Sequence, residues 1–221
     1  IDTTFEEKII LPGFIDPHLH PSMASVILPM QFITALEWKL PWGTSPAVGS
    51  REAYLEALAS HASEPNDAPF FTWGYHRDWH GNITRPDIDA ICPGRPVIVW
   101  HRSFHEVIMN SAALAHFNLE TDAIAAHPQI DLAQGKFFET GLRLAIAGLN
   151  PVLMSPEHFG LGIARLKQVA HFGGHTLVGD MGIGIFNFDM EWQAACASLD
   201  TPDTPFRIHY TPNILALTPT G

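Results

Sequence analysis

Two histidines near the start of the chain, His18 and His20, stand one residue apart and could hold one metal ion. They end residues 11–20, which read Leu-Pro-Gly-Phe-Ile-Asp-Pro-His-Leu-His and have the turn signal and apolar residues of a short strand. Alternate side chains of an extended chain share a face, so both imidazoles are expected on one side, with Asp16 one step behind. Imidazoles are common zinc ligands, and a carboxylate behind them can orient them. Pro17 has no N–H, so strand pairing is expected to fade there and leave both histidines at the strand's mouth.

The spacing of this pair is not specific by itself. The chain has 13 histidines in 221 residues, so chance alone gives about one His-x-His pair. The alternative is two histidines in a polar loop. The apolar residues before the pair and the glycine at the strand start favour the metal site.

Composition limits the class of protein. The hydrophobic share of 46% and the length of 221 residues predict a globular chain with a sizeable core. A formal charge of −11 without a basic stripe argues against nucleic-acid binding. Two cysteines are too few for a disulfide framework, and no apolar run is long enough to span a bilayer. The start of the chain has no signal-peptide pattern and looks abrupt, which favours a cytoplasmic protein with a truncated beginning.

The remaining elements alternate between helix and strand, as expected of parallel α/β units. Residues 39–49 are rich in proline, glycine and tryptophan and are expected to form a loop. An apolar helix after residue 141 is expected to stop at Asn150 and Pro151. Strands are predicted over residues 70–75, 96–100, 175–180 and 205–210. Helices are predicted to begin at Ser50, Thr84, Asn110, Ser155 and Asn187, and Asp87 stands in the capping-box position after Thr84.

Residues 11–20 resemble the first-strand signature of the amidohydrolase superfamily. The branch that they resemble most is amidohydrolase family 3, which includes the N-substituted formamide deformylases. A second and more specific likeness covers residues 73–119. The residues that match the family's pattern there are Gly74, Trp79, Thr84, Asp87, Asp89, Pro96, Val97, His105, Asn110, Ser111, Ala113 and Leu114.

The resemblance implies an α/β fold that is a partial TIM-like (β/α) barrel, with about the first three barrel strands and an inserted α/β region. Residues 1–24 and 175–221 would form the partial barrel, and residues 25–174 the insertion that covers its mouth. Active sites of such barrels lie at the carboxyl ends of the strands, where His18, His20 and Asp180 are expected. Complete family members continue with further strands, so the chain looks like a fragment, and self-association through the exposed partial barrel is expected.

The resemblance also implies roles for single residues. His18, His20 and Glu139 would bind the metal, Asp16 would support the histidines, and His105, Trp79 and Asp180 would line the substrate pocket. The alternative for Glu139 is a solvated charge in the first turn of a helix. For His101 and His105 the alternative is a structural hydrogen bond at a strand end. No aspartate matches the general base of the family.

The function that follows is a metal-dependent hydrolase that acts on non-peptide C–N bonds, such as those of small-molecule amides or formamides. Zinc is the expected metal, with iron or manganese as alternatives. Two other functions stay open. One is deamination of a cyclic amidine or nucleobase, and the other is a non-catalytic fragment with a vestigial metal site.

Overall fold

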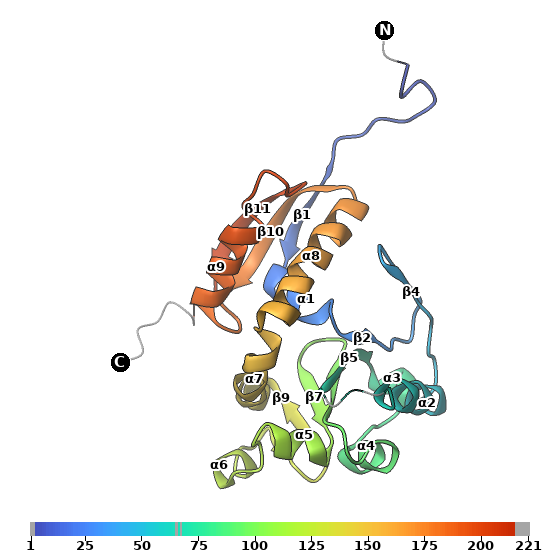
Figure 1. Cartoon of the computed structure of the whole chain (residues 1–221), viewed down its shortest axis with the longest axis vertical. Helices are drawn as coiled ribbons and strands as arrows, with labels where there is room; N and C mark the ends of the chain where they lie inside the picture. Colours follow the sequence, from blue (N-terminus) through green and yellow to red (C-terminus); the bar gives the residue numbers. More distant parts are fainter. Residues whose placement is uncertain (1–2, 65, 67, 215–221) are drawn as a thin grey trace. The chain divides into compact units, whose positions relative to one another are not determined.

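The computed structural model describes residues 3–64, 66 and 68–214, and the chain divides into two compact units (Figure 1). Unit 1 holds the described residues before Pro29 and after His158, and unit 2 is Pro29–His158. The sequence-based boundaries lie at 24/25 and 174/175, so this division differs from them chiefly by placing residues 159–174 in unit 1. The assignment of the two parts as barrel and insertion stays a prediction.

Unit 1 is built on a three-stranded parallel sheet in the order β1-β10-β11. Its strands are β1 (Phe14–Leu19), β10 (His175–Ile183) and β11 (Arg207–Pro212). Its helices are α1 (Pro21–Ile27), α8 (Pro156–Phe172, of which the first residues belong to unit 2) and α9 (Phe188–Ser198). A helix connects β10 to β11, as parallel neighbours require. These parallel strand–helix–strand units agree with the sequence-based expectation. The expectation is wrong for part of unit 2, where several neighbouring strands pair antiparallel.

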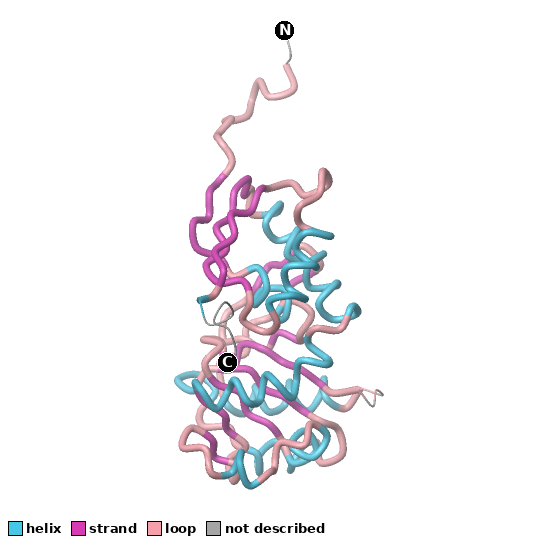
Figure 2. The backbone as a smooth tube through the Cα atoms, turned by 90° about the vertical axis from the view of Figure 1, so that its left-hand side faces the viewer, coloured by secondary structure: helices cyan, strands magenta, loops and turns pink. Residues whose placement is uncertain are grey.

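The helices of unit 1 cover one side of this sheet (Figure 2). Val178 and Ile183 of β10 are each 1% exposed, so the covered side carries the apolar core of the unit. Ile15 and Met181 are 64% and 37% exposed, respectively. The three described strands therefore leave apolar side chains in contact with solvent.

Unit 2 contains a six-stranded mixed sheet in the order β2-β5-β6-β7-β9-β8. The pairs β2–β5 and β5–β6 are parallel, and the remaining pairs are antiparallel. The strands are β2 (Gln31–Phe32), β5 (Phe70–Tyr75), β6 (Val97–His101), β7 (Glu106–Met109), β8 (Ile130–Asp131) and β9 (Lys136–Phe138). The helices are α2 (Arg51–Ala62), α3 (Arg77–His80), α4 (Arg85–Ile91), α5 (Ser111–His116), α6 (Asp122–Ala125) and α7 (Glu139–Leu153).

The predicted helix starts are confirmed by hydrogen bonds at their caps. The Ser50 side chain accepts from the N–H of Ala53 at 3.2 Å, and the N–H of Thr84 donates to Asp87 Oδ2 at 3.0 Å. The Asn110, Ser155 and Asn187 side chains likewise accept backbone N–H groups in the first turns of α5, α8 and α9. Each cap satisfies a donor that the helix itself leaves unpaired.

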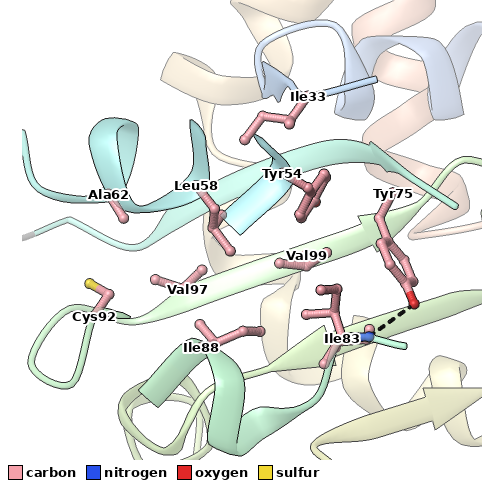
Figure 3. Packing of buried hydrophobic residues seen from close by; sticks show 11 residues of the cluster. Ile33, Tyr54, Leu58, Ala62, Tyr75, Ile83, Ile88, Cys92, Val97 and Val99 are labelled. Atoms are coloured by element: carbon pink, nitrogen blue, oxygen red, sulfur yellow. Dashed lines mark hydrogen bonds between the residues drawn. The ribbon is translucent and has the colours of Figure 1, made fainter. Parts of the chain in front are cut away.

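The core of unit 2 lies between its sheet and helices α2 and α4 (Figure 3). Tyr54 and Leu58 of α2 and Ile88 of α4 are fully buried, and they pack with Val97 and Val99 of β6. The hydroxyl of Tyr75, also in this cluster, accepts the N–H of Ile83 at 3.3 Å, the dashed line in Figure 3. These strand and helix side chains therefore form one hydrophobic cluster in unit 2.

Two local predictions are wrong. Helix α7 does not stop at Asn150 but continues through Pro151 to Leu153. The fully buried side chains of Leu149 and Leu153 pack its last turn in place, which outweighs the hydrogen bond that proline removes. Residues 39–49 are also not entirely loop, because β3 (Trp38–Leu40) and β4 (Gly43–Ser45) form an antiparallel hairpin.

Both cysteines are free thiols, and Cys92 is buried while Cys196 is exposed. Over residues 3–64, 66 and 68–214, none of the helices combines the length and apolar character needed to cross a membrane.

Candidate functional site

His18 and His20 lie at the carboxyl end of β1 with their rings against each other. The ring centroids are 5.2 Å apart, and the planes meet edge to face at 87°. The register of β1 against β10 shifts between Asp16 and Leu19, as expected where Pro17 supplies no N–H. This irregularity breaks the simple alternation along the strand, and His20 already stands at the N-cap of α1, before Pro21.

Asp16 supports this pair through the backbone. Its Oδ1 accepts the N–H of His18 at 3.0 Å, a short side-chain-to-backbone bond that fixes the turn around Pro17. The sequence-based expectation gave Asp16 a supporting role toward the imidazoles. In the structure, Asp16 instead accepts a hydrogen bond from the backbone N–H of His18.

The surroundings of His20 favour a neutral ring. Its Nδ1 is buried and makes no hydrogen bond to the described residues. Burial, and secondarily the neighbouring His18, lowers the pKa of His20, so the ring favours its neutral form. A neutral imidazole with an unpaired nitrogen suits a divalent cation. Gly182 lies beside the ring, and a Cβ there would be in ordinary van der Waals contact with His20 Nδ1, at 3.8 Å.

Asp180 is paired in register with Leu19 on one side and Tyr210 on the other. Asp180 as a whole residue is 1% exposed. Oδ1 accepts the N–H of Gly182 at 3.0 Å, and Oδ2 is buried without a hydrogen-bond partner among the described residues. Burial, with a smaller contribution from Glu191, raises the pKa of Asp180 to about 6. The carboxyl is therefore enclosed by protein, and its place in a substrate pocket stays a prediction.

Glu139 and His105 meet in unit 2. Glu139 opens α7 with a φ of 44°, and its Oε2 lies 3.0 Å from His105 Nδ1. Both side chains are more than half exposed to solvent. The structure thus brings together one predicted metal ligand and one predicted pocket residue, while His18 and His20 belong to unit 1.

Within the part of the chain that the structure describes, no three His, Cys, Asp or Glu side chains gather closely enough to hold a metal ion. The three-ligand set of His18, His20 and Glu139 therefore stays a prediction.

His101 makes the structural hydrogen bond that was the alternative to a role in the site. Its Nδ1 lies 2.7 Å from Ser103 Oγ and accepts the N–H of Ser103 at 3.1 Å. Burial, His76, Arg77 and Arg102 lower the pKa of His101 to about 4. The ring is therefore neutral near pH 7.

Trp79, predicted as a pocket residue, lies on α3 and borders a cleft of about 330 Å³ in unit 2. Trp38, Trp73 and Arg102 also border this cleft. Sequence reasoning missed Trp38 and Arg102 as site residues. Trp38 stands directly before residues 39–49, which were interpreted as loop, and no signal in the sequence marked it as a site residue.

Among known proteins, the chain is similar only in fold to two solved structures that the comparison found. No protein-family model matches the sequence, and no curated protein matches it. Two solved structures resemble the chain, both described as uncharacterized metal-dependent hydrolases, one from Pyrococcus horikoshii OT3 and one from Pyrococcus furiosus. They share 20% and 21% sequence identity with it, at TM-scores of 0.63 and 0.61.

The match covers 91% of this chain in both cases, but only 36% and 37% of the two hydrolases. The chain thus spans little more than a third of the length of these proteins. At this level of identity the similarity establishes a common α/β fold.

Proposed function

We propose that the protein is part of a metal-dependent hydrolase. The observation that carries this proposal is the pairing of His18 with His20 at the end of β1, where the buried His20 Nδ1 has no partner among the described residues. The fold that the chain shares with two uncharacterized metal-dependent hydrolases supports it. The activity is proposed for the chain as a part of such an enzyme, because the match spans 36% of the first of those structures.

His18 and His20 are proposed as ligands of a zinc ion, with Glu139 as the third protein ligand and iron or manganese as alternative metals. Such an ion, when bound, polarises a carbonyl group and lowers the pKa of a bound water to about 7. Two further residues, Asp16 and His105, are proposed to hold the ligands in position. Asp16 fixes the main chain at His18, and His105 Nδ1 holds Glu139 Oε2 at 3.0 Å.

The substrate is proposed to be a small molecule with a non-peptide C–N bond, such as an amide or formamide. This class rests on the resemblance of residues 11–20 and 73–119 to amidohydrolase family 3. Trp79, His105 and Asp180 are proposed to contact the substrate. We assign no residue as the general base.

The parallel sheet β1-β10-β11 is proposed to be the opening part of a (β/α) barrel. Its exposed apolar side chains, Ile15 and Met181 among them, support association with further strands or with a second copy of the chain, since large exposed apolar surfaces mark interfaces.

A second candidate is a non-catalytic module with a vestigial metal site. The specific observation in its favour is that the paired imidazoles of unit 1 supply two ligands, one fewer than catalytic zinc sites normally use. Metal binding without turnover would favour this candidate.

The test is hydrolysis of N-benzylformamide by metal-depleted protein before and after zinc is restored. We expect zinc-dependent turnover that the double variant His18→Ala/His20→Ala lacks. The matched control is His171→Ala, because His171 is an exposed histidine on α8 of unit 1. Equal turnover by metal-depleted and zinc-restored protein would contradict the proposal.

A further inference from the structure

The cleft of unit 2 is lined by three indole rings and one guanidinium group. Of these four side chains, the proposed hydrolysis uses only Trp79, as a substrate contact. It has a volume of about 330 Å³, at the lower end of the range for small-molecule sites. Trp38 comes from β3, Trp73 from β5, Trp79 from α3, and Arg102 follows β6. Three stretches of the chain that are separated in sequence, around residues 38, 73–79 and 102, therefore converge on one cleft.

One wall of the cleft is a packed aromatic cluster. The ring of Trp73 lies 5.0 Å from that of Phe32 and 5.4 Å from that of Trp38, and Trp38 lies 5.6 Å from Phe32, measured between centroids. Trp73 is 9% exposed, whereas Trp38 is 38% exposed. The buried ring fixes the exposed one, so an apolar surface is held open to solvent at the cleft.

Backbone contacts hold the residues Thr34, Trp73 and Gly74 of the cleft lining in place. The N–H of Ile33 donates to the carbonyl of Trp73 at 3.0 Å. Gly74 has a φ of 113°, and a Cβ there would collide with the side chain of Thr34. Only glycine permits both this conformation and this close approach. The site is therefore largely formed before any ligand binds, which lowers the entropy cost of binding.

The charge at the cleft is set by Arg102. Its guanidinium lies 5.7 Å from the ring centroid of Trp79, and it makes no ion pair with any carboxylate of residues 3–64, 66 and 68–214. The other cation at the cleft, Lys39, lies 3.8 Å from Glu37 Oε1, so these two opposite charges balance in the formal charge of the lining and Arg102 leaves it positive. An organic cation would bind against the face of an aromatic ring. At Trp79 the guanidinium of Arg102 already lies beside the ring, so a ligand cation there would be repelled.

We propose that this cleft binds a small molecule that carries an aromatic or apolar ring and a carboxylate. The ring contacts Trp38 and Trp79, and the carboxylate pairs with Arg102, whose planar donor group matches a carboxylate in geometry. This inference goes beyond the proposed hydrolysis. The two share Trp79, but binding in the cleft requires no metal, so metal-depleted protein tests it separately.

The test is calorimetric titration of the metal-depleted full chain with naphthylacetate, naphthylacetamide and naphthylmethyl-trimethylammonium. These probes share a ring and differ in the charge of the group attached to it. We expect naphthylacetate to bind about fivefold more tightly than the amide, the factor that corresponds to ~1 kcal/mol for a partly exposed ion pair. The ammonium probe should bind most weakly, and added salt should reduce the preference for the acetate.

Two variants separate the charge from the aromatic wall. Arg102→Gln should make the acetate and amide bind equally well, and Trp79→Leu should weaken both. Arg143→Gln is the matched control, because Arg143 is exposed on α7 of the same unit and away from the cleft lining. Circular dichroism establishes that each variant is folded.

The proposal is overturned if naphthylacetate does not bind, or if the ammonium probe binds more tightly than the acetate. It is also overturned if folded Arg102→Gln keeps the preference for the acetate, or if Arg143→Gln loses that preference to the same extent.

Discussion

His105 and Glu139 contact each other twice, through side chains and through the backbone. His105 Nδ1 lies 3.0 Å from Glu139 Oε2, and the N–H of Glu139 donates to the carbonyl oxygen of His105 at 3.2 Å. The two residues are 34 positions apart, so tertiary structure brings them together. Glu139 has a φ of 44°, a left-handed conformation that costs free energy in any residue except glycine.

This conformation gives a prediction that compares two variants of Glu139. Both Glu139→Ala and Glu139→Gly remove the side-chain contact with His105 and keep the backbone hydrogen bond. The side-chain contact is worth less than about 1 kcal/mol because both side chains are exposed. Only the glycine variant also relieves the strained backbone. We expect Glu139→Gly to be more stable than Glu139→Ala by about 1 kcal/mol in urea unfolding. An alanine variant as stable as the glycine variant would show that the backbone at Glu139 is unstrained.

Because of Asp180, we expect the free energy of unfolding of the chain to depend on pH. The pKa of Asp180 is about 6 in the folded chain, above the ordinary value of 3.8, so the folded state binds more protons than the unfolded state between these values. Stability from this group therefore rises as the pH falls from about 6 toward 4. The neutral variant Asp180→Asn should be more stable than the wild type at pH 7, by up to about 3 kcal/mol, and this difference should shrink on acidification.

The measurement for Asp180 is urea unfolding of metal-depleted protein across this pH range. The control is Asp203→Asn, since Asp203 is exposed in the same unit. A stability difference between wild type and Asp180→Asn that stays constant with pH would rule out the raised pKa.

We expect a large loss of stability when the side chain of Glu191 is shortened to that of alanine. This carboxylate is 1% exposed and accepts the N–H groups of Gly184, Phe186 and Asn187 at 2.7, 2.6 and 2.9 Å. Glu191→Ala leaves these donors without their partner, which should cost about 2–4 kcal/mol in the free energy of unfolding. Glu157→Ala, at an exposed position in the first turn of α8, should cost less than about 1 kcal/mol. Similar losses in both variants would mean that Glu191 does not hold the β10–α9 connection.

Features set by neighbouring residues could be predicted from the sequence. Ser50, Thr84 and Asn187 cap their helices as expected because a cap depends on a side chain and the N–H groups two or three residues later. Strand β5 was predicted with its observed bounds because it is a continuous apolar run between turn signals.

Features set by distant contacts could not be predicted in this way. Pro151 lies inside α7 because buried neighbours hold the last turn, and the hairpin at Trp38 depends on packing against Phe32 and Trp73. The same limit applies to the site. The sequence placed His18 beside His20, which is a local relationship, but the contact between Glu139 and His105 and the convergence of Trp38, Trp79 and Arg102 are not local.

The central claim is that His18 and His20 together bind a divalent metal ion. The most direct test is zinc titration of metal-depleted protein by calorimetry, with X-ray absorption spectroscopy to count the imidazole ligands. We predict one zinc ion per chain with two imidazoles in its coordination shell, an affinity reduced at least about tenfold in His18→Ala and in His20→Ala, and no change in His171→Ala. Zinc binding of equal affinity in the double variant His18→Ala/His20→Ala, or a zinc ion without imidazole ligands, would contradict the account.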